Sequence, residues 1–94
     1  MENKTPKRRL IFSPDGWRDY CSWEQKQYAK KLRRINDLLE DIVRNGASKG
    51  IGKPERLRHI DAWSRRIDDE NRLVYTESDE GITILFCRGH YEDL

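Results

Sequence analysis

The sequence GKPERLRHIDAWSRRIDDENRLVY, residues 52–75, decides how this chain folds. Apolar and polar residues alternate in it over short runs, and the acidic cluster at residues 68–70 separates two of those runs. Alternation with a period of two is typical of half-buried strands. Four strands are therefore predicted in the second half of the chain: Glu55–His59, Trp63–Ile67, Asn71–Glu77 and Ile82–Arg88. The turn at residues 78–81 ends in glycine, so the last two strands should form a hairpin.

Helical periodicity precedes these strands. Within Gln25–Asn45, apolar side chains recur at helical intervals: Tyr28, Leu32, Ile35, Leu39 and Ile42. This spacing predicts an amphipathic helix of about five turns that packs on a sheet and ends at Asn45-Gly46. Nearer the N-terminus, Arg8–Ser13 is predicted as a first strand, and Ser13 followed by Pro14 marks the start of another helix.

These elements together predict an α+β fold of two layers. Two N-terminal helices should pack on one face of a mostly antiparallel sheet of four to five strands. The 94 residues should form a single domain, residues 1–94, in which residues 1–7 are a flexible polar tail. No apolar run approaches the ~20 residues of a membrane span, and no secretory signal is recognisable. The two cysteines lie far apart, which favours reduced thiols in a cytoplasmic protein.

Charge is distributed unevenly along the chain. The net charge is +2, but residues 26–72 hold 13 Lys and Arg against 8 Asp and Glu, whereas residues 73–94 hold 1 against 5. A basic middle favours an anionic partner such as a phosphate group, although charge counts alone favour an ordinary solvated surface. The alternation of apolar and polar residues also predicts which face of the sheet carries the arginines. If Leu73 and Tyr75 pack on the helices, Arg72 and Arg66 lie on the opposite, open face of the sheet.

A cationic open face suggests chemistry on RNA, which carries its own nucleophile in the 2′-hydroxyl. Cleavage needs a base for that hydroxyl, an acid for the departing 5′-oxygen and cations at the phosphate. Glu55 is a candidate base, His90 a candidate acid and Arg72 a candidate phosphate ligand. Further candidates would bind the substrate or stack on a base: Arg58, Arg65, Arg66 and Tyr91. The scheme takes neither a metal nor a cofactor, and alone it is weakly specific because most surface glutamates are simply solvated.

Other kinds of site fit the sequence less well. The glycine-rich residues 46–54 lack the Gly-Lys-Ser/Thr ending of a phosphate-binding loop, and no strand precedes them. A zinc site built from His59, His90 and Cys87 has no closely spaced ligand pair. Cys87 beside His90 can be imagined as a nucleophile, but a cysteine in an apolar strand is usually a packing residue.

Several motifs in this order resemble a known family: LIFSPDGWRDYCSW, GKPERLRH, WSRRIDDENRLVY and CRGHY. Over about residues 10–91 the chain is similar to the Txe/YoeB toxins, a branch of the RelE superfamily of bacterial toxin–antitoxin systems. The resemblance implies a RelE-like fold and a ribosome-dependent endoribonuclease that cuts mRNA in the ribosomal A site. It also implies a YefM/Axe-type antitoxin, contact with operator DNA only through the antitoxin complex, and a homodimer as a further option.

The same resemblance assigns roles by position. Glu55, after Gly-Lys-Pro, matches the family's general base, and Arg72, before Leu-Val-Tyr, matches its phosphate-stabilising arginine. His90 matches the catalytic histidine, and Tyr91 is the tyrosine beside it. Two further positions match substrate-binding residues: Arg58, where lysine is usual, and Arg66, the second arginine of Trp-Ser-Arg-Arg.

The chain departs from the family's pattern at three places. The connection at residues 60–62 is shorter, Gly89 replaces a larger residue, and the acidic tail Glu92-Asp93-Leu94 follows His-Tyr. Gly89 and the tail favour a second hypothesis, a non-catalytic module that binds nucleic acid or a protein partner on the same fold. A third hypothesis is a ribosome-independent ribonuclease, against which the mild basic balance argues.

Overall fold

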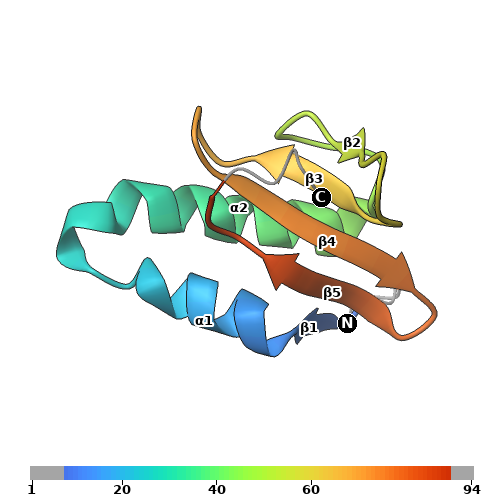
Figure 1. Cartoon of the computed structure of the whole chain (residues 1–94), viewed down its shortest axis with the longest axis horizontal. Coiled ribbons are helices and arrows are strands. Elements are labelled where there is room, and N and C mark those ends of the chain that lie inside the picture. The colour runs from blue at the N-terminus through green and yellow to red at the C-terminus, as the bar shows by residue number, and fades with distance from the viewer. Residues whose placement is uncertain (1–7, 90–94) are drawn as a thin grey trace, which may run out of the picture.

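Within residues 8–89, which the computed structural model describes, five strands form one sheet and two helices cover one of its faces (Figure 1). The elements are β1 (Leu10–Phe12), α1 (Pro14–Ser22), the 3₁₀ turn η1 (Lys26–Tyr28), α2 (Ala29–Asn45), β2 (Glu55–Arg56), β3 (Trp63–Arg66), β4 (Arg72–Ser78) and β5 (Gly81–Phe86). The strand order is β1-β5-β4-β3-β2, and neighbours are antiparallel except β1 and β5, which are parallel. The predicted α+β class and its two layers are confirmed. The tail predicted at residues 1–7 lies outside the described residues.

Helix α1 begins where the sequence predicts. Ser13 precedes it and accepts a hydrogen bond on Oγ from Gly16 N at 2.9 Å, which satisfies one of the free amides of the first turn. Gly16 is required because an ideal Cβ at this position would lie 2.2 Å from Ile84 O in β5. Just after the helix, the buried Trp23 donates from Nε1 to Cys87 O at 2.8 Å. These contacts fix α1 against the end of β5.

The core lies between α2 and the sheet. Helix α2 contributes the buried side chains Ile35, Leu38, Leu39 and Ile42. The sheet and its C-terminal extension contribute Leu73, Tyr75, Ile82, Ile84 and Cys87. The predicted helix differs at its start, where Lys26–Tyr28 forms a 3₁₀ turn, and it ends as predicted at Gly46, which has φ of 92° and donates its N–H to Ile42 O. Among the described residues, no helix is long and apolar enough to cross a bilayer.

Four observed strands, β1, β2, β3 and β5, are shorter than predicted. At β2 and β5 other groups take the backbone hydrogen bonds. After β2, Leu57 N donates to Ala62 O at 2.9 Å and closes the loop of residues 57–62. After β5, Cys87 N donates to Asp19 Oδ2 of α1 at 3.0 Å instead of continuing the ladder. The predicted hairpin between β4 and β5 is confirmed by their antiparallel pairing across residues 78–81.

The register divides side chains between the two faces of the sheet. On the helix side the pairs across β3 and β4 are Trp63 with Tyr75 and Arg65 with Leu73. On the opposite face they are Ser64 with Val74 and Arg66 with Arg72. Arg66 and Arg72 therefore share the face away from the helices, as predicted. That face is not open throughout, because Ser64 and Val74 are buried.

An ion pair ties α2 to the turn between β3 and β4. Lys31 Nζ lies 2.8 Å from Asp68 Oδ2, and Asp68 Oδ1 accepts hydrogen bonds from Glu70 N and Asn71 N at 2.8 and 2.7 Å. Partial burial alone would raise the pKa of Asp68. The hydrogen bonds from Lys31 and from the two amides outweigh burial and hold the pKa at about 2, against an ordinary value of 3.8.

Asp68 should make the folded protein sensitive to acid. A lowered folded-state pKa contributes stability above the ordinary value, and this contribution is lost as the pH falls from about 4 through 2. We expect about 1–2 kcal/mol from this carboxylate, allowing for the half-exposed Lys31. Urea unfolding at pH 7 and pH 3 should show a smaller acid loss for Asp68→Asn than for the wild type, whereas the neighbouring Asp69→Asn should behave like the wild type. An equal loss in all three proteins would contradict the assignment.

Candidate active site

Glu55 and Arg72 meet on the sheet face away from the helices. Glu55 lies on the edge strand β2 and pairs with Ser64 of β3, while Arg72 begins β4, on the other side of β3. Glu55 Oε1 lies 3.6 Å from Arg72 Nη1, and the two side chains are 66% and 20% exposed. A solvent-facing carboxylate thus lies beside a largely buried guanidinium, which places a proton acceptor and an anion-binding group at one point.

Arg72 has an unused hydrogen-bond donor. Among residues 8–89, its Nε is the one buried side-chain nitrogen or oxygen atom without a hydrogen-bond partner. The 3.6 Å separation from Glu55 is also too long for a hydrogen bond, so the ion pair is loose. A buried donor without an acceptor costs free energy, and the planar guanidinium fork of Arg72 is suited to an anion with two or more oxygens.

Backbone hydrogen bonds bring the last described residue to Arg72. Arg72 N donates to Gly89 O at 3.0 Å, and Gly89 N donates to Asn71 Oδ1 at 2.8 Å. Gly89 has φ of 94°, a conformation that glycine adopts without strain. The predicted catalytic residues His90 and Tyr91 lie outside the described residues. Their covalent connection to the domain starts beside Arg72.

The predicted substrate-binding residues Arg58 and Arg66 are both exposed. Arg66 lies opposite Arg72 in the register of β3 and β4, so two guanidinium groups belong to the same face. The backbone of Arg66 is fixed, because its N donates to Gly52 O at 2.8 Å and its O accepts from Arg34. Arg58 lies in the loop of residues 57–62. In the described part of the chain neither side chain forms an ion pair, which leaves both available to a ligand.

The prediction that Arg65 binds the substrate is wrong. Its side chain is 0% exposed and lies on the helix side of the sheet. The guanidinium donates to Asp41 and Tyr75 and to backbone carbonyls in the loop before β2. Alternation contained this signal, since Arg65 falls in register with the inward-facing Trp63. No sequence pattern singled out Asp41, its acidic partner.

Sequence reasoning also missed an interaction next to Glu55. Arg56 pairs with Asp61, and its Cζ lies 5.9 Å from the centre of the Trp63 ring. These contacts, a salt bridge and a cation–π interaction, close the short loop that carries Arg58. The feature that could have revealed this interaction is the antiparallel pairing of β2 with β3, which places Arg56 directly opposite Trp63.

Cys87 does not have the properties of a nucleophile. It is 0% exposed, and burial raises the pKa of its thiol to about 12, so the thiol stays protonated at neutral pH. Cys21 is partly buried, and both cysteines are free thiols. Among residues 8–89, no three His, Cys, Asp or Glu side chains are grouped closely enough to hold a metal ion.

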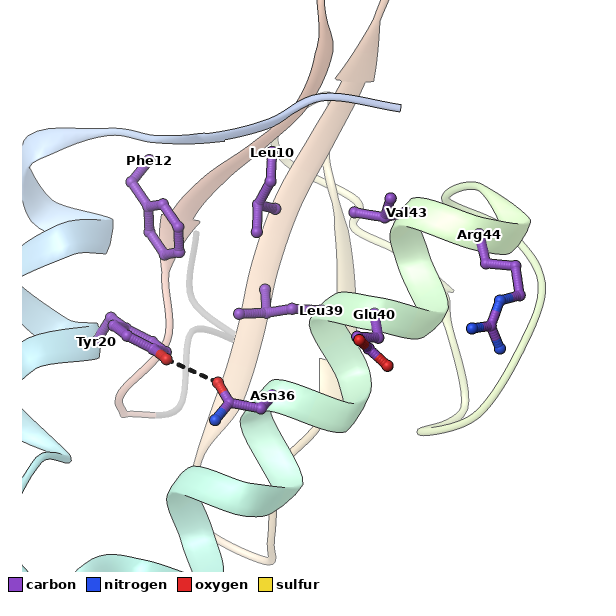
Figure 2. Close-up of a pocket in the computed structure, with 8 residues that line it drawn as sticks. All are labelled: Leu10, Phe12, Tyr20, Asn36, Leu39, Glu40, Val43 and Arg44. Atoms are coloured by element: carbon purple, nitrogen blue, oxygen red, sulfur yellow. Dashed lines mark hydrogen bonds between the residues drawn. The ribbon is translucent and has the colours of Figure 1, made fainter. Parts of the chain in front are cut away.

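Neither Glu55 nor Arg72 lines the cavity that Figure 2 shows. It has a volume of about 380 Å³ and is lined by side chains of β1, α1 and α2: Leu10, Phe12, Tyr20, Asn36, Leu39, Glu40, Val43 and Arg44. Within it, Tyr20 Oη donates to Asn36 Oδ1 at 2.7 Å and links the two helices (Figure 2). Because the cavity lies on the helical side of the fold, it is not part of the candidate active site.

Comparison with known proteins identifies a family whose sequences match this chain. Residues 12–91 match the family described as YoeB-like toxin of bacterial type II toxin–antitoxin system. The toxin YoeB of Streptomyces coelicolor is 45% identical over 85 residues, which cover 88% of this chain and 99% of the relative.

Two solved structures from Staphylococcus aureus share the fold. A YoeB dimer superposes with a TM-score of 0.82 and a YoeB–YefM complex with 0.79. In both, the matched chain is 44% identical, and the match covers 92% of this chain and 100% of the other. This chain therefore belongs to the family of YoeB-like toxins of bacterial type II toxin–antitoxin systems.

Proposed function

We propose that this toxin is a ribosome-dependent endoribonuclease that cleaves mRNA in the ribosomal A site and thereby stops translation. One observation carries the proposal: the exposed Glu55 carboxylate lies 3.6 Å from a guanidinium, that of Arg72, whose Nε has no partner among the described residues. Attack by a 2′-hydroxyl on the adjacent phosphate needs a base and a phosphate ligand this close together. Membership of the toxin family supports the same activity.

In the proposed reaction Glu55 accepts the proton of the 2′-hydroxyl, and the 2′-oxygen attacks the adjacent phosphorus. The bond from phosphorus to the 5′-oxygen breaks, and His90 protonates the departing oxygen. The products are a 2′,3′-cyclic phosphate and a free 5′-hydroxyl. Arg72 donates to the non-bridging oxygens, where negative charge increases in the transition state. Tyr91 stacks on a base or donates a hydrogen bond to it.

The substrate is held by cations beside the reacting groups. Arg58 and Arg66 are exposed and, in the described part of the chain, have no acidic partner, so they can contact neighbouring phosphates. A net charge of +2 provides only weak attraction for free RNA. The ribosome supplies what the toxin lacks, because it presents a fixed mRNA segment and lowers the entropic cost of aligning it.

The proposed partners follow from the relatives. A Staphylococcus aureus YoeB forms a complex with YefM, and a YoeB dimer from the same organism has been solved. By analogy we expect a YefM/Axe-type antitoxin to suppress this toxin and to carry it to operator DNA. A homodimer is expected in the absence of the antitoxin. The proposed site of action is the bacterial cytoplasm, where translating ribosomes are found.

Purified protein, ribosomes and a short mRNA test this function. Mapping of 5′ ends should reveal cuts within the A-site codon when the ribosome is positioned on the message, and no comparable cuts when ribosomes are omitted. Cleavage of free RNA at a similar rate would instead support a ribosome-independent ribonuclease. A folded protein that cuts neither substrate would support the non-catalytic binding module.

A further inference from the structure

The guanidinium of Arg65 is enclosed and fully hydrogen-bonded. Its side chain is 0% exposed. A guanidinium carries five N–H bonds, and each finds one acceptor: Nε on Tyr75 Oη (2.8 Å), Nη1 on Asp41 Oδ2 (2.5 Å) and Ile51 O (2.9 Å), and Nη2 on Gly46 O (2.9 Å) and Lys49 O (2.7 Å). No N–H group of Arg65 is left to bind a substrate, so its role is to hold the protein groups around it in place.

Most of these acceptors belong to one loop, residues 46–54, which connects α2 to β2. Three of the five are carbonyl oxygens of that loop. The two side chains that bind Arg65 also hold the loop, because Asp41 Oδ2 accepts from Ile51 N at 3.1 Å and Tyr75 Oη donates to Ala47 O at 2.7 Å. Next in the chain, Gly52 O accepts from Arg66 N. The loop backbone is thus fixed from residue 46 to residue 52.

The acidic and phenolic partners of Arg65 are in the ionisation states that this network needs. Partial burial would raise the pKa of Asp41, but hydrogen bonds from Arg65 and Ile51 N hold it below its usual value, so Asp41 is a carboxylate at neutral pH. Burial raises the pKa of Tyr75, so its hydroxyl keeps the proton that it donates to Ala47 O. The network is therefore complete at physiological pH.

The loop leads directly to the proposed general base. Glu55 follows Gly52 by three residues, and the strand that carries it, β2, has only two residues paired with β3. Such a short edge strand provides few hydrogen bonds to set the position of its side chains. Rate is sensitive to that position, because a displacement of about 1 Å can cost about 100-fold.

We propose that Arg65 is the positioning residue for Glu55: through Asp41, Tyr75 and the loop carbonyls it fixes the backbone that holds the base next to Arg72. The inference rests on the proposed ribonuclease activity, in which Glu55 is the base. A role in stability alone explains the arrangement less well. An apolar side chain can replace a buried ion pair without loss of stability, but it cannot bind three loop carbonyls at once.

Three conservative variants separate positioning from simple stabilisation. Asp41→Asn replaces the ionic acceptor, Tyr75→Phe removes the hydroxyl, and Arg65→Lys keeps the charge but has too few donors for all five acceptors. The matched control is Asp37→Asn, an exposed residue of α2 outside the network. Three quantities are measured on each protein: the hydrogen-exchange rate of the Ile51 amide, and the kcat and KM of mRNA cleavage on programmed ribosomes.

We expect the Ile51 amide of Asp41→Asn to exchange at least about 10-fold faster than in the wild type, because its hydrogen bond to the carboxylate is weakened. The amide of Ile35, a buried residue near the middle of α2, should be unaffected. In all three variants kcat should fall about 10- to 100-fold, while KM changes less than about threefold, since the substrate-binding arginines are intact. Asp37→Asn should match the wild type in every measurement.

The outcomes distinguish the positioning role from the activity itself. If the wild type cuts and the loop of Asp41→Asn exchanges faster but kcat is unchanged, Arg65 does not position the base. A fall in kcat without faster exchange overturns the inference as well. If the wild type fails to cut, the proposed ribonuclease is rejected, and the positioning role is rejected with it. Should Arg65→Lys not fold, Asp41→Asn and Tyr75→Phe still decide the matter.

Discussion

Glu55→Gln should lower the single-turnover rate of A-site mRNA cleavage by about 100- to 10,000-fold, the range found when a general base is removed. Glutamine keeps the size and hydrogen-bonding reach of the side chain but cannot accept the 2′-hydroxyl proton at neutral pH. The Glu55 side chain is 66% exposed and its contact with Arg72 is loose, so the free energy of unfolding should change by less than about 0.5 kcal/mol. The loss of rate would thus be chemical.

The matched control for this variant is Glu80→Gln, an exposed glutamate in the turn between β4 and β5. It should cleave at the wild-type rate. Expression in bacteria without antitoxin gives a second measurement, since growth should stop with the wild type and the control but continue with Glu55→Gln. Full cleavage by Glu55→Gln would show that another group takes the proton.

Arg72→Ala should reduce the cleavage rate by about 100- to 1,000-fold, because it removes the donors aimed at the charge that accumulates on the phosphate. Arg72→Lys should recover part of this loss. An ammonium group keeps the positive charge but lacks the planar fork that binds two oxygens at once. The effect should fall mainly on kcat, as expected for an interaction that strengthens in the transition state.

Folding should survive both substitutions at Arg72. The hydrogen bond to Gly89 O comes from the backbone N of Arg72 and is retained whichever side chain follows. Arg33→Lys, on an exposed part of α2, is the matched control and should leave the rate unchanged. If Arg72→Lys cleaves as fast as the wild type, the guanidinium geometry has no role and simple charge suffices.

Periodicity predicted β3 and β4 to within one residue at each end. Along β3 and β4 the alternation of apolar and polar residues reflects the division between the two faces of the sheet. β2 and β5 were overestimated for a different reason. Their ends are set by contacts that no local pattern contains, such as the hydrogen bond from Cys87 N to Asp19. Tertiary competition for backbone groups decides where a strand stops.

The site was predictable to the extent that it depends on alternation and family motifs. Alternation placed Arg72 away from the core, and the motif GKPE singled out Glu55, which chemistry alone did not separate from other glutamates. Arg65 was misassigned because its role depends on Asp41, 24 positions earlier in the chain. Alternation places Arg65 on the same face as Trp63, but only the structure shows that this face encloses the guanidinium completely.

The hydrogen bonds of Arg65 to Asp41, Tyr75 and the loop carbonyls also bear on when the proposed active site can form during synthesis of the chain. Asp41 and the loop carbonyls are synthesised before Arg65, but the hydroxyl of Tyr75 and the guanidinium of Arg72 belong to β4, which leaves the ribosome later. A nascent chain that ends before β4 has Glu55 but neither its complete support nor its phosphate ligand. The proposed active site therefore cannot assemble until β4 has been translated.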